Sequence, residues 1–331
     1  MMEKSQRDDL MRMVNGYQVS QAIHVAAVLG VPDVLKDGAR HVADIADQTD
    51  TDPQALYRLL RALAAVDVFF EGDQRTFSLT PLGRGLVLET QGSLRDYAIF
   101  VGHESNWDTW GNLLDGIRNG ENVFRQVHGT SVWDYRAQRP EVSAMFNRAT
   151  AATKLKGSVL GIYDFSPFRS IVDVGGGNGS MLADILRVNP LAQGILFDQP
   201  HVVSQDQLDA AGVAARCEVM GGDFFRQVPK GGDLYVLRAV LHDWDDADCI
   251  EILKTCRNAM ADPARLLIVE RLIEPPNVGR EIKFFDLTMF VLPGGRERTR
   301  EEYSSLIAAA GLEVARVTEP GGDNFSAIEA L

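Results

Sequence analysis

The stretch that decides the fold is residues 171–180, Ile-Val-Asp-Val-Gly-Gly-Gly-Asn-Gly-Ser. An apolar run typical of a buried strand leads directly into glycines, and a helical pattern follows from Met181 to Arg187. Glycines at a strand end allow a tight turn and let a ligand reach backbone N–H groups at the start of a helix. Ser180 stands where the dinucleotide fingerprint has its third glycine. The stretch predicts either a ligand-binding turn or a purely structural one.

From Ser170 onward, strand-like apolar runs alternate with helical stretches. The runs are Ile171–Val174, Ile195–Phe197, Leu234–Leu237 and Leu266–Val269, with Phe325–Leu331 as a final strand. This alternation is typical of a parallel sheet with helices on both faces. We therefore predict a doubly wound, Rossmann-like α/β domain over residues 166–331.

Acidic residues end the next two predicted strands. Asp198 follows the second strand, where a carboxylate can accept both hydroxyls of a ribose. Asp223 and Phe224 follow the third, where they can bind the amino group and the ring of adenine. No phosphate-binding lysine or basic cradle accompanies them. The pattern predicts an adenosine pocket without a phosphate site, which fits S-adenosylmethionine.

The first 95 residues predict a winged-helix-like domain. A helix is expected over 6–29 and another over Val42–Gln48, and Asp52 can cap a third that starts at Pro53. Two short strands, 68–71 and 76–79, surround a turn, and Thr80-Pro81 is expected to open a further helix.

A winged helix often binds DNA, but the candidate recognition helix carries only Arg58 and Arg61. A dimerisation or scaffolding role is favoured. Residues 96–165 predict a helical connector whose aromatic residues, Trp107 and Phe146 among them, either fill a core or form the wall of an apolar pocket.

Composition excludes several classes of protein. The 331 residues include 33 Lys and Arg against 46 Asp and Glu, a formal net charge of −13, with a pI near 4.9. Phosphate-rich nucleic acids and anionic membranes need positive charge, so neither is expected as a partner. Three cysteines without metal-ligand spacing and the lack of a targeting pattern predict a cytoplasmic protein.

Four motifs together resemble the S-adenosylmethionine-dependent O-methyltransferases of the caffeic-acid and hydroxyindole type. They are DVGGGNG (173–179), FDQPHVV (197–203), GGDFF (221–225) and RAVLHDWDD (238–246). Bacterial members of the family modify aromatic natural products. The resemblance covers nearly the whole chain and implies an N-terminal winged-helix-like dimerisation domain, a homodimer, and S-adenosylmethionine as methyl donor with S-adenosylhomocysteine as product. Because a sulfonium methyl needs no activation and the sequence shows no ligand cluster, no metal is expected.

The resemblance also implies roles for single residues. Gly175, Asp198, Asp223, Phe224 and Arg238 match cofactor-binding positions, and Arg238 stands where plant members have lysine. His242 matches the general base, with Glu270 and Glu297 as its flanking carboxylates. A phenol has a pKa near 10, so a base that removes its proton assists methyl transfer.

The predicted acceptor pocket departs from the plant pattern. Thr150 replaces a methionine that clamps the substrate, and Leu292 replaces an asparagine that reads ring substituents. The other expected wall residues are Trp107, Phe146, Phe284, Leu287 and Thr288. We predict methylation of a phenolic hydroxyl on a bulkier aromatic from a secondary-metabolite or antibiotic pathway. Methylation of nitrogen or carbon on the same scaffold stays open, as does a winged-helix regulator that senses S-adenosylmethionine.

Overall fold

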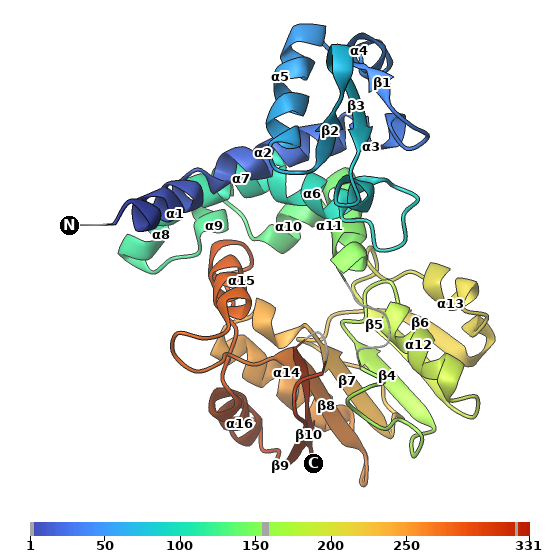
Figure 1. Ribbon diagram of the computed structural model, residues 1–331. Coiled ribbons are helices and arrows are strands. Elements are labelled where there is room, and N and C mark those ends of the chain that lie inside the picture. The colour runs from blue at the N-terminus through green and yellow to red at the C-terminus, as the bar shows by residue number, and fades with distance from the viewer. Residues whose placement is uncertain (1–2, 154–158, 322–323) are drawn as a thin grey trace. The chain divides into compact units, whose positions relative to one another are not determined.

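The computed structural model describes residues 3–153, 159–321 and 324–331, and the chain forms two compact units (Figure 1). The first unit contains the chain up to Gly111 and the segment from Arg139 that holds one more helix. The second contains residues 112–138 and the chain from Leu155 to the end. The chain therefore passes from one unit to the other three times. Within the described ranges, no helix is both long and apolar enough to cross a membrane.

The first unit combines helices with a small sheet. Its elements are α1 (Lys4–Val14), α2 (Gly16–Val28), α3 (Val31–Val34), β1 (Arg40–His41), α4 (Val42–Thr49), α5 (Pro53–Ala64), β2 (Phe69–Glu71), β3 (Thr76–Leu79), α6 (Arg95–Gly102), α7 (Glu104–Gly111) and α11 (Pro140–Thr153). The strands form an antiparallel sheet in the order β1-β3-β2. Helix α6 packs against both α2 and α11.

Local signals in the sequence set the start of α5. The Asp52 side chain accepts a hydrogen bond from the N–H of Ala55 at 2.8 Å, and Pro53 occupies the first turn. Leu56, Leu60 and Leu63 then fall on one buried face. The cap and the hairpin of β2 and β3 are confirmed as predicted. The winged-helix assignment itself stays a prediction.

Two expectations for the first unit were wrong. The single helix over 6–29 is divided into α1 and α2 at Asn15, where ψ is 2°. Asn15 and Gly16 are both weak helix formers, so the pair ends one helix and starts the next. The helix expected from Thr80 is reduced to a 3₁₀ turn at Gly83–Leu86. The Thr80 hydroxyl accepts the N–H of Gly83 at 3.0 Å, which competes with helical pairing of the backbone.

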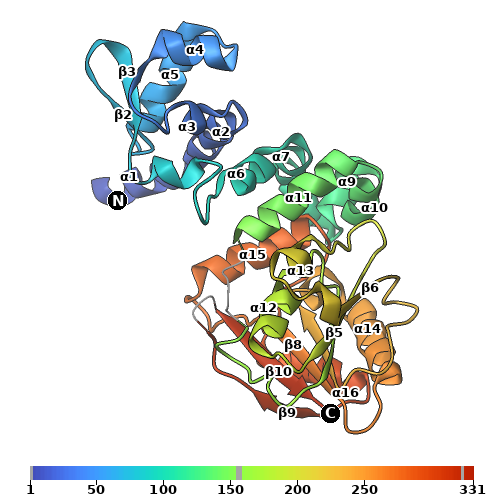
Figure 2. The same ribbon diagram turned by 90° about the vertical axis from the view of Figure 1, so that its right-hand side faces the viewer.

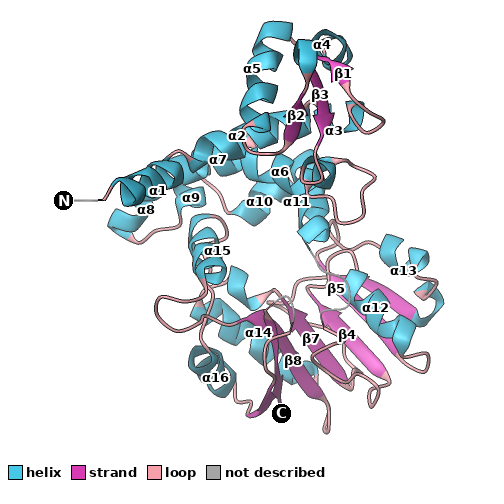
Figure 3. Ribbon diagram, viewed as in Figure 1, coloured by secondary structure: helices cyan, strands magenta, loops and turns pink. Residues whose placement is uncertain are grey.

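The second unit is built on a seven-stranded sheet. Figures 2 and 3 show helices on both faces of this sheet. Its elements are α8 (Leu113–Asn119), α9 (Val123–His128), α10 (Val132–Ala137), β4 (Ser170–Val174), α12 (Ser180–Val188), β5 (Gln193–Asp198), α13 (Asp206–Ala210), β6 (Cys217–Gly221), β7 (Leu234–Arg238), α14 (Asp246–Ala259), β8 (Arg265–Arg271), α15 (Arg280–Val291), α16 (Arg300–Ala309), β9 (Val314–Val317) and β10 (Phe325–Ala330).

The strand order β6-β5-β4-β7-β8-β10-β9 puts a topological switch beside β4. Strands β4 to β8 are parallel, and β10 runs antiparallel to both β8 and β9. One face is covered by α12 and α13, and the other by α14 and α16. Because β5 and β7 leave β4 in opposite directions, a crevice is expected at the carboxyl ends of these strands.

Candidate active site

The glycine turn connects β4 to α12 at the carboxyl edge of the sheet. Gly175 has a φ of +72°, and a Cβ added there would lie 2.8 Å from Cγ2 of Val240. Both the backbone conformation and the space therefore require glycine at this position. Gly179, which precedes α12, provides no side-chain cap for the helix.

Asp198, at the end of β5, is fastened to the glycine turn. Its Oδ2 accepts the N–H of Gly177 at 2.8 Å, and its Oδ1 accepts the N–H of Gln199 at 2.6 Å. The structure thus places a half-buried carboxylate at the glycine turn between β4 and α12.

The two neighbouring strand ends carry the other predicted cofactor residues. After β6, Asp223 accepts the N–H of Phe225 at 2.9 Å and keeps about half of its side chain exposed, at 51%. The Phe224 ring lies 3.8 Å from the Cβ that Gly175 lacks. At the end of β7, the Arg238 guanidinium lies over the ring of Phe325, 5.1 Å from its centroid.

The structure brings His242, Glu270 and Glu297 together. His242 lies on the 3₁₀ turn Leu241–Asp243 and is 8% exposed. Its Nδ1 lies 2.9 Å from Oε1 of Glu297 and 3.3 Å from Oε2 of Glu270. Both carboxylates therefore contact Nδ1, and Nε2 lies on the side of the ring that faces away from them. The donor atoms of this trio lie within 4.8 Å of one another, a spacing that a metal ion can also use.

Glu270 also holds the backbone that carries the histidine. It ends a buried run of β8 and is 0% exposed. Its Oε1 accepts the N–H groups of Val240 at 3.1 Å, Leu241 at 2.9 Å and His242 at 3.4 Å. One carboxylate therefore positions the turn through one oxygen and faces the imidazole with the other.

Charge and burial compete at this cluster. Burial lowers the pKa of the His242 imidazole, but the charges of Glu270, Asp243 and Glu297 outweigh it and raise the pKa to about 10. Burial raises the pKa of Glu270 to about 7, with His242 acting against the rise and Glu297 adding to it. The carboxylates around the imidazole thus favour its protonated form and make it a stronger base.

The predicted acceptor residues are distributed over both units. Trp107, Phe146 and Thr150 belong to α7 and α11 of the first unit, where Phe146 packs on Phe100 at 5.5 Å between ring centroids. Phe284, Leu287 and Thr288 belong to α15 of the second unit, and Leu292 follows that helix. The Phe284 side chain is exposed, whereas Leu292 is buried.

Two family models match the chain. The O-methyltransferase domain covers residues 110–313, and the O-methyltransferase dimerisation domain covers residues 11–89. The chain belongs to the S-adenosylmethionine-dependent O-methyltransferases. The resemblance drawn from the sequence motifs is therefore confirmed, as is the α/β methyltransferase fold.

The methyltransferase is similar over its whole length to enzymes of natural-product biosynthesis. It is 42% identical to phenazine O-methyltransferase PhzM of Lysobacter antibioticus, over 97% of this chain and 95% of the relative. It is 40% identical to O-demethylpuromycin-O-methyltransferase of Streptomyces alboniger, over 98% and 89%. The solved structure of LaPhzM matches with a TM-score of 0.94 at 41% identity and 98% coverage of both chains.

Other relatives bear on the cofactor and on the methylated atom. The solved structure of NcsB1 from neocarzinostatin biosynthesis, at 29% identity and a TM-score of 0.82, contains S-adenosylmethionine and a naphthoic acid; the match covers 94% of this methyltransferase and 95% of that chain. The 8-amino-8-demethylriboflavin N,N-dimethyltransferase of Streptomyces davaonensis is 36% identical, over 94% and 91%. The family scaffold therefore also occurs in a protein named for methylation of nitrogen.

Sequence reasoning missed three residues around the histidine of this methyltransferase. Asp243 Oδ1 lies 3.7 Å from Nε2, and burial raises the pKa of this carboxyl to about 6 although His242 and Arg136 lower it. Arg136 of α10 is buried, and burial lowers its pKa to about 10. Phe285 of α15 meets the imidazole ring edge to face, with centroids 5.7 Å apart. Of these three residues, only Asp243 lies within a sequence motif, His-Asp-Trp-Asp-Asp, that could have drawn attention to it.

Proposed function

We propose that this chain transfers the methyl group of S-adenosylmethionine to a phenolic hydroxyl of an aromatic natural-product intermediate, with His242 as general base. The observation that carries the proposal is the pairing of Nδ1 with two buried carboxylates, at 2.9 and 3.3 Å. A proton held on Nδ1 by these carboxylates leaves Nε2 as the nitrogen that can accept one.

The strand-end residues fit the methyl donor. Asp198 offers two oxygens to a ribose, and Phe224 lies against the glycine turn, where an adenine ring would stack. We assign Gly175, Asp223 and Arg238 to the same pocket. When bound, S-adenosylmethionine supplies an electrophilic methyl group on a sulfonium, which needs no metal to activate it.

The protein then performs two tasks. It holds the acceptor oxygen in line with the methyl group, which contributes through proximity and orientation. It also takes the phenolic proton onto Nε2 of His242, while Glu270 and Glu297 stabilise the resulting imidazolium. A phenol has a pKa near 10, and the charges of Glu270, Asp243 and Glu297 raise the His242 pKa above its ordinary value, which favours transfer of the phenolic proton to the imidazole.

The acceptor assignments stay predictions. Phe284, Leu287 and Thr288 follow one face of α15, whose Phe285 contacts the imidazole. Trp107, Phe146 and Thr150 are proposed for the same substrate, with Leu292 near the end of α15. The relatives named for phenazine, O-demethylpuromycin and 3-amino-4-hydroxybenzoate support an aromatic intermediate.

Incubation with S-adenosylmethionine carrying a ¹³C-labelled methyl group and a panel of phenolic aromatics tests the proposal. We expect the label on oxygen, as read from the product mass and the carbon chemical shift. Transfer to nitrogen or carbon would favour the alternative activity, which the N-methyltransferase relatives make plausible. A parallel reaction with a chelator is expected to proceed at the same rate, because the proposed chemistry uses no metal.

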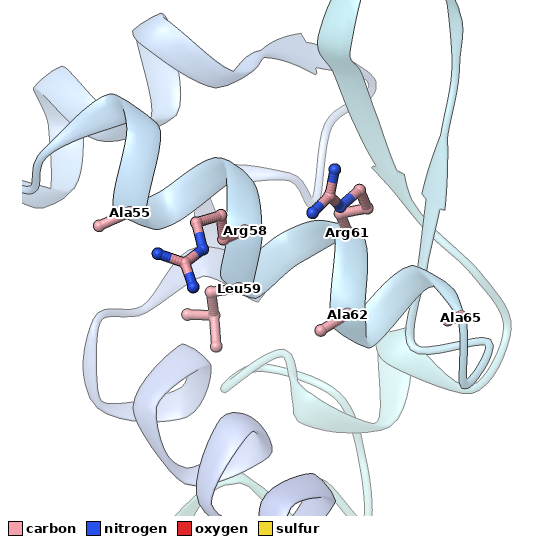
Figure 4. A pocket seen from close by; sticks show the side chains of 6 residues that line it. All are labelled: Ala55, Arg58, Leu59, Arg61, Ala62 and Ala65. Atoms are coloured by element: carbon pink, nitrogen blue, oxygen red, sulfur yellow. The ribbon is translucent and has the colours of Figure 1, made fainter.

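A regulator that binds DNA is the second candidate, and the structure gives it little support. Figure 4 shows a pocket along α5 in which two arginines stand among alanines and a leucine. The residues that line it are Ala55, Arg58, Leu59, Arg61, Ala62 and Ala65. Groove binding requires more basic and amide side chains than these. Unchanged electrophoretic mobility of genomic fragments would exclude this role.

The pH dependence of catalysis follows from the raised His242 pKa. The histidine–phenol pair must lose one proton before transfer, so kcat/KM should rise with pH from neutrality towards about pH 10. Glu297→Gln removes the negative charge that lies 2.9 Å from Nδ1, so the pKa of His242 falls. The rise of kcat/KM with pH should therefore occur at lower pH in this variant.

The matched control for this profile is Glu301→Gln. Glu301 lies in the first turn of α16 and is exposed, so its neutralisation should leave the rise of kcat/KM where it is in the natural chain. If kcat/KM of Glu297→Gln rises over the same pH range as that of the control, the rise does not report the titration of His242.

We also propose that the first 95 residues form a homodimer. Leu10, Met13 and Val14 of α1 and Tyr17 and Val28 of α2 expose between 50% and 70% of their surface. A stripe of this kind favours a partner surface, and twofold pairing is the commonest solution. Light scattering should give about twice the 36.4 kDa of one chain.

The dimer prediction is tested by charge insertion. The double variant Met13→Asp, Tyr17→Asp should scatter as a monomer, because it places two carboxylates in the proposed interface. Leu191→Asp changes a side chain that is 74% exposed in the second unit, and it should remain dimeric. A monomeric natural chain at micromolar concentration would overturn the prediction.

A further inference from the structure

Two segments far apart in the chain meet at His242. The segment 294–299 carries Glu297 and lies directly on the backbone of residues 241–246. A Cβ added to Gly295 would lie 2.1 Å from the carbonyl oxygen of His242 and 2.5 Å from the nitrogen of Trp244. Contact this close requires glycine, so the spacing between the two backbones is fixed by packing.

Arg298 joins the two segments by hydrogen bonds. Its side chain is 0% exposed. Nη1 donates to the carbonyl oxygen of Leu241 at 3.0 Å, and Nη2 donates to that of Trp244 at 2.8 Å. The guanidinium therefore binds the backbone on both sides of His242.

Asp246, at the start of α14, completes the arrangement. Its Oδ1 accepts from Nε and Nη2 of Arg298, at 3.0 and 2.8 Å. Burial acts to raise the pKa of Asp246, but the hydrogen bonds and charges of Arg298 and Arg296 lower it below its usual range. The buried guanidinium thus keeps an ionised partner, as a buried charge requires.

We propose that Arg298, anchored by Asp246, is a positioning residue that sets the contact between Glu297 and the imidazole of His242. Glu297 is the residue before Arg298, and its N–H is also held by Oδ1 of Asp286 at 2.9 Å. The side chain of Arg298 connects this segment to the turn of the histidine. The inference deepens the proposed function and rests on His242 as the general base.

The other charged groups around His242 come from separate elements. Glu270 faces Nδ1 from β8, and Asp243 lies on the histidine's own turn. Arg136 of α10 acts on Asp243, and Tyr303 of α16 lies beside the two glutamates. None of them is changed in the variants below, and Arg298→Lys also keeps the charge at its position, so a His242 titration that changes in Arg298→Lys reports the position of Glu297.

The test measures the imidazole directly, by ¹⁵N NMR titration of His242 in the full-length protein without substrate. In Arg298→Lys a single ammonium cannot reproduce the planar fork that reaches two carbonyls and a carboxylate. We expect the titration of His242 to move to lower pH, towards that of Glu297→Gln. Asp246→Asn, which removes the charge but keeps the shape of the anchor, should move it in the same direction.

Kinetics provide the second readout. Arg298→Lys should lower kcat about tenfold while the affinity for S-adenosylhomocysteine stays within about twofold, since misplacement affects the reacting geometry. In a Glu297→Gln background the same change should have a smaller effect, because the contact is already lost. Arg296→Met is the matched control: Arg296 also pairs with Asp246, at 2.7 Å, but its side chain is 46% exposed, and we expect no change.

The outcomes separate the two proposals. Folded Arg298→Lys and Asp246→Asn proteins with an unmoved His242 titration would overturn the positioning role. An active His242→Ala protein would overturn the general base, whatever the titration shows. If Arg298→Lys does not fold, Asp246→Asn decides the question by the same titration.

Discussion

His242→Ala is expected to lower turnover by about 10²- to 10⁴-fold, the range that general acid–base catalysis contributes. The variant removes the nitrogen that accepts the phenolic proton, and it leaves the strand ends that we assign to the cofactor unchanged. The affinity for S-adenosylhomocysteine should therefore stay within a few-fold. Calorimetry with S-adenosylhomocysteine and single-turnover rates measure the two quantities separately.

His24→Ala is a useful control for this loss. His24 lies in α2 of the first unit, and its Nδ1 contacts the carbonyl oxygen of Ala98 at 3.2 Å. Its removal should have no comparable effect on the transfer rate. If His242→Ala lost cofactor binding together with activity, the histidine would be structural; if it kept full activity, another group would be the base.

Asp198→Ala should weaken S-adenosylhomocysteine binding by about 100-fold. The change removes the proposed acceptor of two ribose hydroxyls, and each buried donor left unsatisfied costs about 1–3 kcal/mol. It also removes the acceptor that holds the N–H of Gly177, so the glycine turn loses a contact at 2.8 Å. Calorimetric titration measures the affinity directly.

Asp198→Asn separates these contributions. The amide keeps one acceptor oxygen and the shape of the side chain, so its affinity should fall between those of the natural chain and Asp198→Ala. Asp184→Ala is the control: this carboxylate of α12 pairs with Arg187 at 3.0 Å, and the variant should bind normally. Equal affinity in Asp198→Ala and the natural chain would place the ribose elsewhere.

The sequence predicted those features whose causes are local. Asp52 and Pro53 marked the start of α5 because capping depends on adjacent residues. The strand ends at Asp198 and Arg238 followed from apolar runs that the structure places in a buried parallel sheet. The break at Asn15 was missed because the apolar spacing continues across it, and periodicity alone does not report where a helix ends.

The cluster of His242, Glu270 and Glu297 could not be predicted from local sequence patterns alone. Glu270 and Glu297 were assigned by resemblance, since nothing in their own surroundings distinguishes them from exposed strand-end and loop residues. Arg298 lies in a charged run that is typical of an exposed loop, so the sequence did not predict its hydrogen bond to the carbonyl oxygen of Leu241, 57 positions away. Such roles depend on segments brought together only by folding, so they become visible once the sheet is assembled.

The repeated passage of the chain between its two units limits how the protein can be cut or recombined. Helix α6 begins at Arg95, yet it packs on α2 and on α11, which the chain forms only after Arg139. A fragment that begins at residue 96 would keep α6 and α11 but expose the surface that α2 covers. Chimeras with a related enzyme should instead exchange residues 1–111 and 139–153 as a pair. We expect single-crossover hybrids at residue 95 to be less soluble than these two-segment exchanges, a difference that library sorting by expression can measure.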